Sequence, residues 1–283
     1  MPELVISIVL GALIGVCILF CIGLFCLRSN KKRRKELLPF TKNYIAHRGV
    51  YDNEETPENS IKAFEAAVAY GYCIELDVRL TKDDVPVVFH DATLVRMCGI
   101  DKRVCDCSYE ELCSYVLAGT GEKIPTFREV LKAIDGRVPV LVEIKGDYAY
   151  KKKAAKTAGV LDGYKGVYAV QSFHPLVLVW FRKQRPWVLR GQLSTDYWCD
   201  RISCTVLQKV VRTDLWCNIV TCPDFVSFRH TMARLWTLRL GRWLYKTPAF
   251  GWTIRSEEEL ALAKKKFDGI IFDSFLPKEK KEN

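Results

Sequence analysis

Residues 73–91 of this 283-residue chain read CIELDVRLTKDDVPVVFHD, in which the polar turn 81–84 joins two apolar runs of strand type, 73–78 and 85–90. Such a turn between two such runs predicts a β-hairpin, with the second run folded back on the first. Seven further runs of strand type occur at 44–47, 138–145, 167–172, 188–193, 225–228, 249–254 and 269–272. With the returning hairpin strand set aside, eight runs remain, the number of parallel strands in a closed α/β barrel.

Segments of helical periodicity lie between these runs. In residues 60–70 and 126–134 apolar side chains recur at helical spacing, and Ser60 and Thr126 are suitable N-caps. The alternation of strands and helices predicts an α/β fold, for which we favour a (β/α)8 TIM barrel. An open doubly wound sheet is the alternative, although no G-x-G-x-x-G motif follows the first strand. Residues 91–125 have little periodicity and are expected to form a small insertion over the barrel mouth.

Polar side chains gather at the carboxyl ends of the predicted strands. They are His47, Arg48, Glu75, Asp77, Glu143, Lys145, Ser172 and Trp252. In a barrel of parallel strands these ends meet at one mouth, where the active sites of such barrels lie. The sequence therefore predicts that residues far apart along the chain share one site.

Three carboxylates in this group suggest a metal ion. Glu75 and Asp77 are two residues apart, so on a strand they point to the same face, and Glu143 has the equivalent place on the next strand. Carboxylates buried together are costly unless a cation holds them, and an all-oxygen set suits Mg²⁺ or Ca²⁺ better than zinc. The alternative is a set of salt bridges to nearby cations, namely Arg48, Arg79 or Lys145.

Two of the four histidines in the chain, His47 and His90, belong to the same group of strand ends. Two imidazoles beside a metal site are expected to act as general base and general acid, because they exchange protons near neutral pH. Arg48 and Lys145 would hold phosphoryl oxygens. These residue types together predict metal-assisted cleavage of a phosphodiester.

The motifs occur in the order seen in a known family. They are IAHRG (45–49), PENS (57–60), IELDV (74–78), LTKD (80–83), PVVFHD (86–91), IPTF (124–127), VEIK (142–145), QSF (171–173), GWTI (251–254) and DGIIFD (268–273). This series resembles the glycerophosphodiester phosphodiesterase family and covers nearly the whole chain beyond residue 42.

The resemblance implies a TIM barrel that hydrolyses glycerophosphodiesters to glycerol 3-phosphate and an alcohol. By position the resemblance assigns metal binding to Glu75, Asp77 and Glu143, and acid/base chemistry to His47 and His90. It assigns phosphate contacts to Arg48 and Lys145 and a supporting role to Glu58 and Asn59. Phe173 and Trp252 match positions on the glycerol side of the pocket. Lysophospholipase D-type cleavage of lysophospholipids and a catalytically inactive membrane-tethered binding module are the alternatives.

Two segments fit the family pattern poorly, residues 199–222 and the basic aromatic stretch 228–243. In the second, arginines at 229, 234, 239 and 242 alternate with tryptophan and leucine. One interpretation is a helix that lies on a membrane surface. The other, which we favour from the sequence, is a helix packed on the barrel with a solvated basic face.

The amino-terminal residues 4–27 contain no charge over 24 positions, long enough for a helix to cross a bilayer. A signal peptide is the alternative, but the run is long and has no positive residue before it. Six basic residues between 28 and 35 follow, so by the positive-inside rule the remaining chain should face the cytoplasm. We expect a transmembrane anchor (1–27), a basic juxtamembrane stem (28–42) and a barrel (43–283). The stem either acts only as a stop-transfer signal or also binds anionic lipid headgroups.

Charge and cysteine usage give weaker evidence. The formal net charge is +10, but about half of the excess lies beside the predicted anchor, which argues against nucleic acid as a partner. Twelve cysteines in no regular framework are easier to keep reduced than to pair, which agrees with a cytoplasmic domain. Cys98, Cys105, Cys107 and Cys113 form an alternative zinc set, although they lack C-x2-C spacing.

Overall fold

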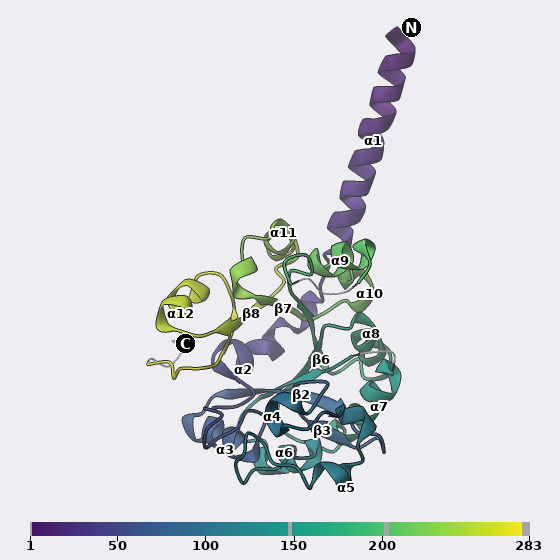
Figure 1. The fold of residues 1–283 in the computed structure, drawn as a ribbon. Coiled ribbons are helices and arrows are strands. Elements are labelled where there is room, and N and C mark those ends of the chain that lie inside the picture. Colours follow the sequence, from purple (N-terminus) through teal and green to yellow (C-terminus); the bar gives the residue numbers. More distant parts are fainter. Residues whose placement is uncertain (1, 147–148, 201–203, 279–283) are drawn as a thin grey trace.

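The computed structural model describes residues 2–146, 149–200 and 204–278, and it contains a closed barrel with helices on its outside (Figure 1). The barrel strands are β1 (Tyr44–His47), β2 (Cys73–Leu80), β4 (Val140–Ile144), β5 (Tyr168–Ser172), β6 (Leu189–Ser194), β7 (Phe225–Arg229), β8 (Ala249–Ile254) and β9 (Gly269–Phe272). Each pairs in parallel with the next, and β1 pairs with both β9 and β2, which closes the ring. The predicted TIM barrel is confirmed.

The hairpin predicted from residues 73–91 is also present. Strand β3 (Pro86–Val88) runs antiparallel to β2, with Val88 opposite Val78. The hydroxyl of Thr81 accepts a hydrogen bond from the backbone N–H of Val85 at 2.9 Å, which closes the turn. β3 therefore lies outside the ring, and Pro86 is tolerated because it lies in an edge strand.

The helices form the outer layer and the connections. They are α1 (Pro2–Cys26), α2 (Leu38–Thr41), α3 (Ile61–Tyr70), α4 (Val95–Cys98), α5 (Tyr109–Leu112), α6 (Phe127–Ile134), α7 (Tyr150–Leu161), α8 (Pro175–Gln184), α9 (Val206–Thr213), α10 (Asn218–Thr221), α11 (Trp236–Tyr245) and α12 (Glu257–Lys264), with 3-10 turns η1 (Lys31–Leu37), η2 (Val104–Asp106) and η3 (His230–Met232). Both predicted caps are formed. Ser60 accepts from the N–H of Ala63, and Thr126 makes a capping box with Glu129.

The inward side chains at the amino-terminal ends of the strands form an apolar floor. Each of the eight strands contributes one buried residue: Ile45, Cys73, Leu141, Ala169, Leu189, Phe225, Phe250 and Ile271. Leu37 and Phe40, from η1 and α2, pack against this layer from below. The floor is thus sealed by the segment that precedes the first strand.

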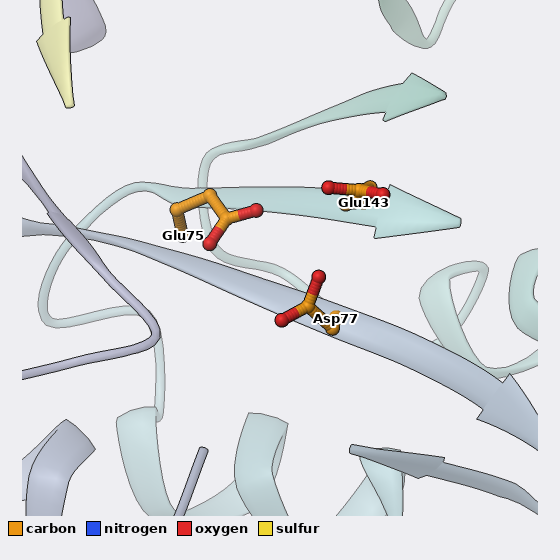
Figure 2. A group of neighbouring side chains, drawn as sticks. All are labelled: Glu75, Asp77 and Glu143. Atoms are coloured by element: carbon orange, nitrogen blue, oxygen red, sulfur yellow. The ribbon is translucent and has the colours of Figure 1, made fainter. Parts of the chain in front are cut away.

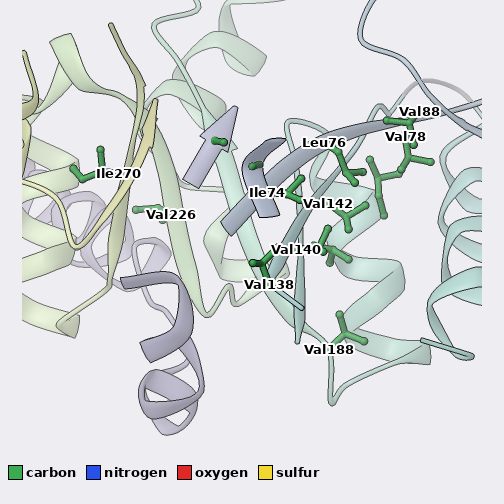
Figure 3. Close-up of a cluster of buried hydrophobic side chains, with 14 of the residues drawn as sticks. Ile74, Leu76, Val78, Val88, Val138, Val140, Val142, Val188, Val226 and Ile270 are labelled. Carbon is green, nitrogen blue, oxygen red and sulfur yellow. The ribbon is translucent and has the colours of Figure 1, made fainter. Parts of the chain in front are cut away.

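The outward side chains of the same strands face the helices. On β2 these are Ile74, Leu76 and Val78, which alternate with the inward residues and are almost completely buried (Figure 3). Val140 and Val142 continue this layer on the neighbouring strand β4. Because both faces of a parallel strand are covered, the strands are apolar except where a polar side chain points into the barrel.

The insertion over residues 91–125 has a small core of its own. Leu94, Met97, Val104, Leu112 and Leu117 are buried together there, with α4, η2 and α5 around them. This cluster also includes Val87 and Phe89 of the hairpin. The insertion is therefore held on β3 and beside the carboxyl end of β2.

Helix α1 leaves the barrel at the end of the molecule where α9, α10 and α11 lie (Figure 1). It is long and apolar enough to cross a membrane, by length and composition. Its last turns touch the barrel domain: Leu27 is buried, and the hydroxyl of Tyr245 donates to the carbonyl of Leu24 at 3.1 Å. The basic segment after it lies on the barrel too, because Asn30 donates to Asp224 at 2.9 Å and Arg33 donates to the carbonyl of Trp187.

Gly191 is the inward residue two positions after Leu189 on β6, and its substitution tests how tightly the barrel interior is packed. A Cβ added to Gly191 would lie 2.2 Å from the ring of Phe225, whereas one added to Gly159 in α7 has nothing within 4 Å. Overpacking of this kind costs about 1–3 kcal/mol, so Gly191→Ala should lower the thermal midpoint of the detergent-solubilised chain. Gly159→Ala is the matched control and should hold or raise the midpoint, because alanine favours a helix interior by roughly 0.5–1 kcal/mol. Equal midpoints for the two variants, measured by circular dichroism, would contradict this account.

Candidate active site

The structure brings the predicted site residues together at the carboxyl ends of the strands. A cavity of about 150 Å³ is lined by His47, Arg48, Glu75, His90, Glu143, Lys145, Gln171, Phe173, Trp252 and Arg255, among others. Asp77 lies directly beside it, bonded to Lys145. Residues that are up to about two hundred positions apart in the chain thus share one mouth, as parallel strand ends in a barrel require.

Glu75, Asp77 and Glu143 form a carboxylate cluster that can hold a metal ion. One oxygen from each lies within 4.8 Å of the others, and all three side chains are buried. Asp77 and Glu143 are opposite each other on β2 and β4, with Glu75 one step deeper on β2 (Figure 2). Three oxygen donors without nitrogen or sulfur fit a hard divalent cation such as Mg²⁺ or Ca²⁺.

The electrostatics of Glu75 support this assignment. Burial, followed by the nearby charges of Asp77 and Glu143, raises the pKa of Glu75 well above its usual value. Its carboxylate has two weak contacts, a bond from the Gln171 amide at 3.4 Å and one from the backbone N–H of Arg48 at 3.3 Å. A cation in the cluster would remove the repulsion that now disfavours the charged form.

Lys145 provides the counter-charge for the other two carboxylates. Its Nζ lies 2.6 Å from Oδ1 of Asp77 and 2.5 Å from Oε1 of Glu143. Burial alone would raise the pKa of Asp77, but Lys145, His90 and Arg48 overcome it and hold that pKa well below the usual range. Ion pairs of the kind expected in the alternative are present, to Lys145 and, at 3.4 Å, to Arg48. Arg79 instead donates to the carbonyl of His90.

His47 forms a dyad with an aspartate from the last strand. Its Nδ1 lies 2.8 Å from Oδ2 of Asp273, and Arg255 donates to the other carboxylate oxygen at 2.9 Å. Burial alone would raise the pKa of Asp273, but the bond from His47 and the charge of Arg255 lower it to about 2. An ionised carboxylate can only accept, so Nδ1 of His47 carries the proton and Nε2 is free to take one.

His90 forms a second dyad of the same kind. Its Nδ1 lies 2.6 Å from Oδ1 of Asp91, and Arg96 donates to Oδ2 of that aspartate at 2.6 Å. Burial is the main cause that lowers the pKa of His90, to about 4, and burial likewise lowers the pKa of His47. Both imidazoles are therefore neutral at pH 7 and each presents a basic Nε2.

Glu58 and Asn59 hold the residues around them in place. Glu58 accepts from Arg48 at 2.9 Å and from Arg96 at 2.7 Å, so it links the two arginines. The amide of Asn59 donates to Oδ2 of Asp77 at 2.9 Å. Arg48 and Asn59 have φ values of 61° and 58°, the left-handed region that non-glycine residues rarely adopt outside constrained sites. Glu58 and Asn59 thus contact Arg48, Arg96 and Asp77.

The cavity has an aromatic wall on the side of β5 and β8. Phe173 and Trp252 meet edge to face with their ring centroids 5.8 Å apart. The guanidinium of Arg229 lies over the Trp252 ring at 5.7 Å. An apolar wall in the same cavity as Glu75 and Glu143 is suited to the carbon skeleton of a small substrate.

Sequence reasoning assigned no role to five residues that the structure places in or next to the site. They are Asp91, Arg96, Gln171, Arg255 and Asp273. Gln171 and Asp273 lie two residues beyond floor residues on β5 and β9, and Arg255 directly follows β8. His47 and Glu143 were chosen because they are polar residues at the carboxyl ends of strands. Gln171, Asp273 and Arg255 are also polar residues at strand ends, so the same criterion could have selected them.

Comparisons with known proteins agree with this geometry. The glycerophosphoryl diester phosphodiesterase family model matches residues 47–219. A lysophospholipase D from Rattus norvegicus is 36% identical over 132 residues, which are 42% of this chain and 40% of that protein. Glycerophosphodiester phosphodiesterase 1 from Bos taurus is 34% identical over 117 residues, which are 38% of this chain and 34% of that protein. The chain thus matches less than half the length of these curated relatives.

Solved structures share the fold. A phosphodiesterase from Oleispira antarctica, solved in complex with the product sn-glycerol-3-phosphate, superposes with a TM-score of 0.66 and 21% sequence identity. The superposition covers 82% of this chain and 92% of that one. At this identity the likeness concerns the barrel architecture.

The carboxylate cluster predicts that divalent cations stabilise the fold. Mg²⁺ or Ca²⁺ at roughly a hundred times its dissociation constant should add about 2.7 kcal/mol to the free energy of unfolding, seen as a rise in thermal midpoint. Asp77→Asn should abolish the rise, because the amide removes one anionic ligand. Asp101→Asn, at an exposed carboxylate in the insertion, should leave it intact. A rise that survives in Asp77→Asn would place the cation elsewhere.

Proposed function

Since this chain belongs to the glycerophosphoryl diester phosphodiesterase family, we propose that it hydrolyses glycerophosphodiesters to glycerol 3-phosphate and an alcohol with a divalent cation in its site. The observation that carries the proposal is the carboxylate cluster of Glu75, Asp77 and Glu143 in the same mouth as two Asp–His dyads. Cation ligands, a phosphate-binding guanidinium and two bases within one cavity are what phosphodiester cleavage needs.

Arg48 and Lys145 are the phosphate-binding residues of this proposal. Both are cations at the cavity, and each already balances a carboxylate, so they add charge without being isolated in the interior. Their remaining N–H groups can donate to the non-bridging oxygens of a phosphodiester. A cation bound by Glu75, Asp77 and Glu143 would neutralise the charge that develops on the same oxygens.

The two dyads supply the proton transfers. One imidazole accepts at Nε2 the proton of the attacking nucleophile, which is either water or a substrate hydroxyl whose cyclic phosphate product water then opens. The other imidazole donates a proton to the leaving oxygen. Both are neutral before substrate binds, so the second must gain its proton in the complex, where the phosphate anion favours the imidazolium. Asp273 and Asp91 fix each ring in the tautomer that leaves Nε2 available. An inactive binding module would not need this arrangement of two matched dyads.

We further propose that the chain is a single-pass membrane protein with its barrel in the cytoplasm. Its support is helix α1, together with six basic residues between positions 28 and 35 at its carboxyl end. This location, and the similarity to a lysophospholipase D, favour a second candidate activity, lysophospholipase D-type cleavage of lysophospholipids. The two activities share their chemistry and differ in what the cavity wall admits.

Release of glycerol 3-phosphate from glycerophosphocholine by the purified full chain tests the main proposal. We expect turnover that EDTA removes and that Mg²⁺ or Ca²⁺ restores. His47→Ala should lower kcat about 10²- to 10⁴-fold, because it removes one proton-transfer group. His230→Ala, a histidine of η3 outside the cavity, is the matched control and should keep full activity. Absence of turnover on every glycerophosphodiester tried, or turnover insensitive to EDTA, would refute the proposal.

The aromatic wall predicts the preference between the two substrates. With a cavity of about 150 Å³ bounded by Phe173 and Trp252, kcat/KM should be higher for glycerophosphocholine than for lysophosphatidylcholine in mixed micelles. Trp252→Ala opens the wall and should raise the relative rate on the lysophospholipid. A wild-type rate on lysophosphatidylcholine that equals or exceeds the rate on the soluble diester would make lysophospholipase D the better assignment.

A further inference from the structure

One face of helix α11 is exposed and carries two tryptophans. Trp236, Arg239 and Trp243 are spaced at i, i+3 and i+7, which puts them on the same side of a helix. The tryptophans are 52% and 70% exposed. The other side of the helix, with Leu238 and Gly241, is buried against the barrel domain. Stability of the barrel therefore explains one face of α11 and leaves the tryptophan face without a structural reason.

Helix α9 and the loop before it add further exposed apolar side chains. Val206 and Leu207 in the first turn of α9 are 68% and 70% exposed. Trp198 is half exposed, and the ammonium of Lys209 lies 5.3 Å above its ring. Large apolar residues scattered singly are normal on a protein surface, but a group of them on adjacent elements marks an interaction site. We call Trp198, Val206, Leu207, Trp236, Arg239 and Trp243 the α9–α11 face.

The buried side of α11, and helix α10 near it, contact the last turns of helix α1. Gly241 of α11 packs against Leu27, and Tyr245 donates to the carbonyl of Leu24. Ile219 of α10 lies in an apolar groove with Ile22 and Phe25 of α1. In Figure 1, α9, α10 and α11 gather at the end of the barrel from which α1 projects. The α9–α11 face therefore lies at the same end of the barrel as the helix that would enter the bilayer.

The segment that contains α11 carries only positive charges. From residue 225 to residue 255 the sequence has five arginines and one lysine besides histidine, and no aspartate or glutamate. Arg234, Arg239 and Lys246 are exposed. Basic side chains between tryptophans are what a surface in the headgroup layer of an anionic bilayer carries, since indole rings prefer the interface and cations attract the lipid phosphates.

We propose that the α9–α11 face docks the barrel on the surface of an anionic bilayer, with Trp236 and Trp243 inserted at the headgroup level. The proposal rests on α1 as a membrane helix and is independent of the hydrolytic activity. It also has a consequence for the site. Arg229 binds Asp200 of the same loop as Trp198 and lies over Trp252, so the docked face extends to the aromatic wall of the cavity. Docking holds the rim of the mouth at β6–β8 close to the headgroups.

Quenching of tryptophan fluorescence by brominated phosphatidylcholine tests the docking. The full chain is reconstituted in nanodiscs of phosphatidylcholine, with and without phosphatidylserine, and compared with the double variant Trp236→Phe/Trp243→Phe. The wild-type chain should be quenched by the brominated lipid, more strongly when phosphatidylserine is present. The double variant should lose most of that quenching and keep a remainder from Trp198 and from Trp216, which packs near Gly23 of α1. Phenylalanine preserves an apolar exposed side chain, so the fold is maintained.

Trp187→Phe is the matched control, because Trp187 is also an exposed tryptophan, 61% accessible, and lies before β6 at the floor end of the barrel. This variant should be quenched as strongly as wild type. Loss of quenching in Trp187→Phe with full quenching in the double variant would show that the floor end faces the lipid and would overturn the proposal. Absent quenching together with two chains per nanodisc by mass photometry would overturn it in favour of self-association.

Discussion

The alternation of side chains along eight closed strands is the constraint on which the site depends. Each strand of the ring contributes one inward residue to the apolar floor, and the next inward residue lies two positions further on. Two positions above the floor these residues are His47, Glu75, Glu143, Gln171, Gly191, Ser227, Trp252 and Asp273. The polar layer thus begins where the floor ends, and a shift of one residue in any strand would turn its polar side chain into the helix layer.

Burial of so many charges is tolerated because nearly every one is paired. His47 and His90 each have an aspartate on Nδ1, and each of these aspartates has an arginine, Arg255 for Asp273 and Arg96 for Asp91. Lys145 balances Asp77 and Glu143. Glu75 is the exception in the carboxylate cluster, because its two contacts are long and its pKa is raised well above the usual value. Burial raises the pKa of Glu143 too, but Lys145 lies against that carboxylate. An uncompensated buried carboxylate costs free energy unless it is protonated or binds a cation, so Glu75 is where a bound cation would contribute most.

Local patterns in the sequence were sufficient for the fold and for most of the site. Apolar runs located the strands, and the turn at 81–84 identified β3 as the strand outside the ring, because both depend on near neighbours. The dyad of His47 and Asp273 joins residues 226 positions apart, and its formation depends on the pairing of β1 with β9, which no local pattern specifies. The link from Arg96 to Glu58 depends on how an aperiodic insertion folds. In α11 both faces carry large apolar residues, so the sequence could not decide which face packs on the barrel.

The segment between α1 and β1 determines how the barrel is oriented relative to helix α1. Leu37 and Phe40 fill the floor, Asn30 and Arg33 bind the start of β7 and the turn before β6, and Leu27 is buried beside α11. A flexible tether would let a domain sample many heights and orientations above a bilayer. Here the connection packs on the barrel, so rotation of the barrel about α1 would break the floor contacts of Leu37 and Phe40 and the hydrogen bonds of Asn30 and Arg33. The packing of this segment therefore fixes the direction in which the mouth faces relative to α1. A shorter or longer stem would break these contacts and lower the stability of the fold before it changed the distance between the site and α1.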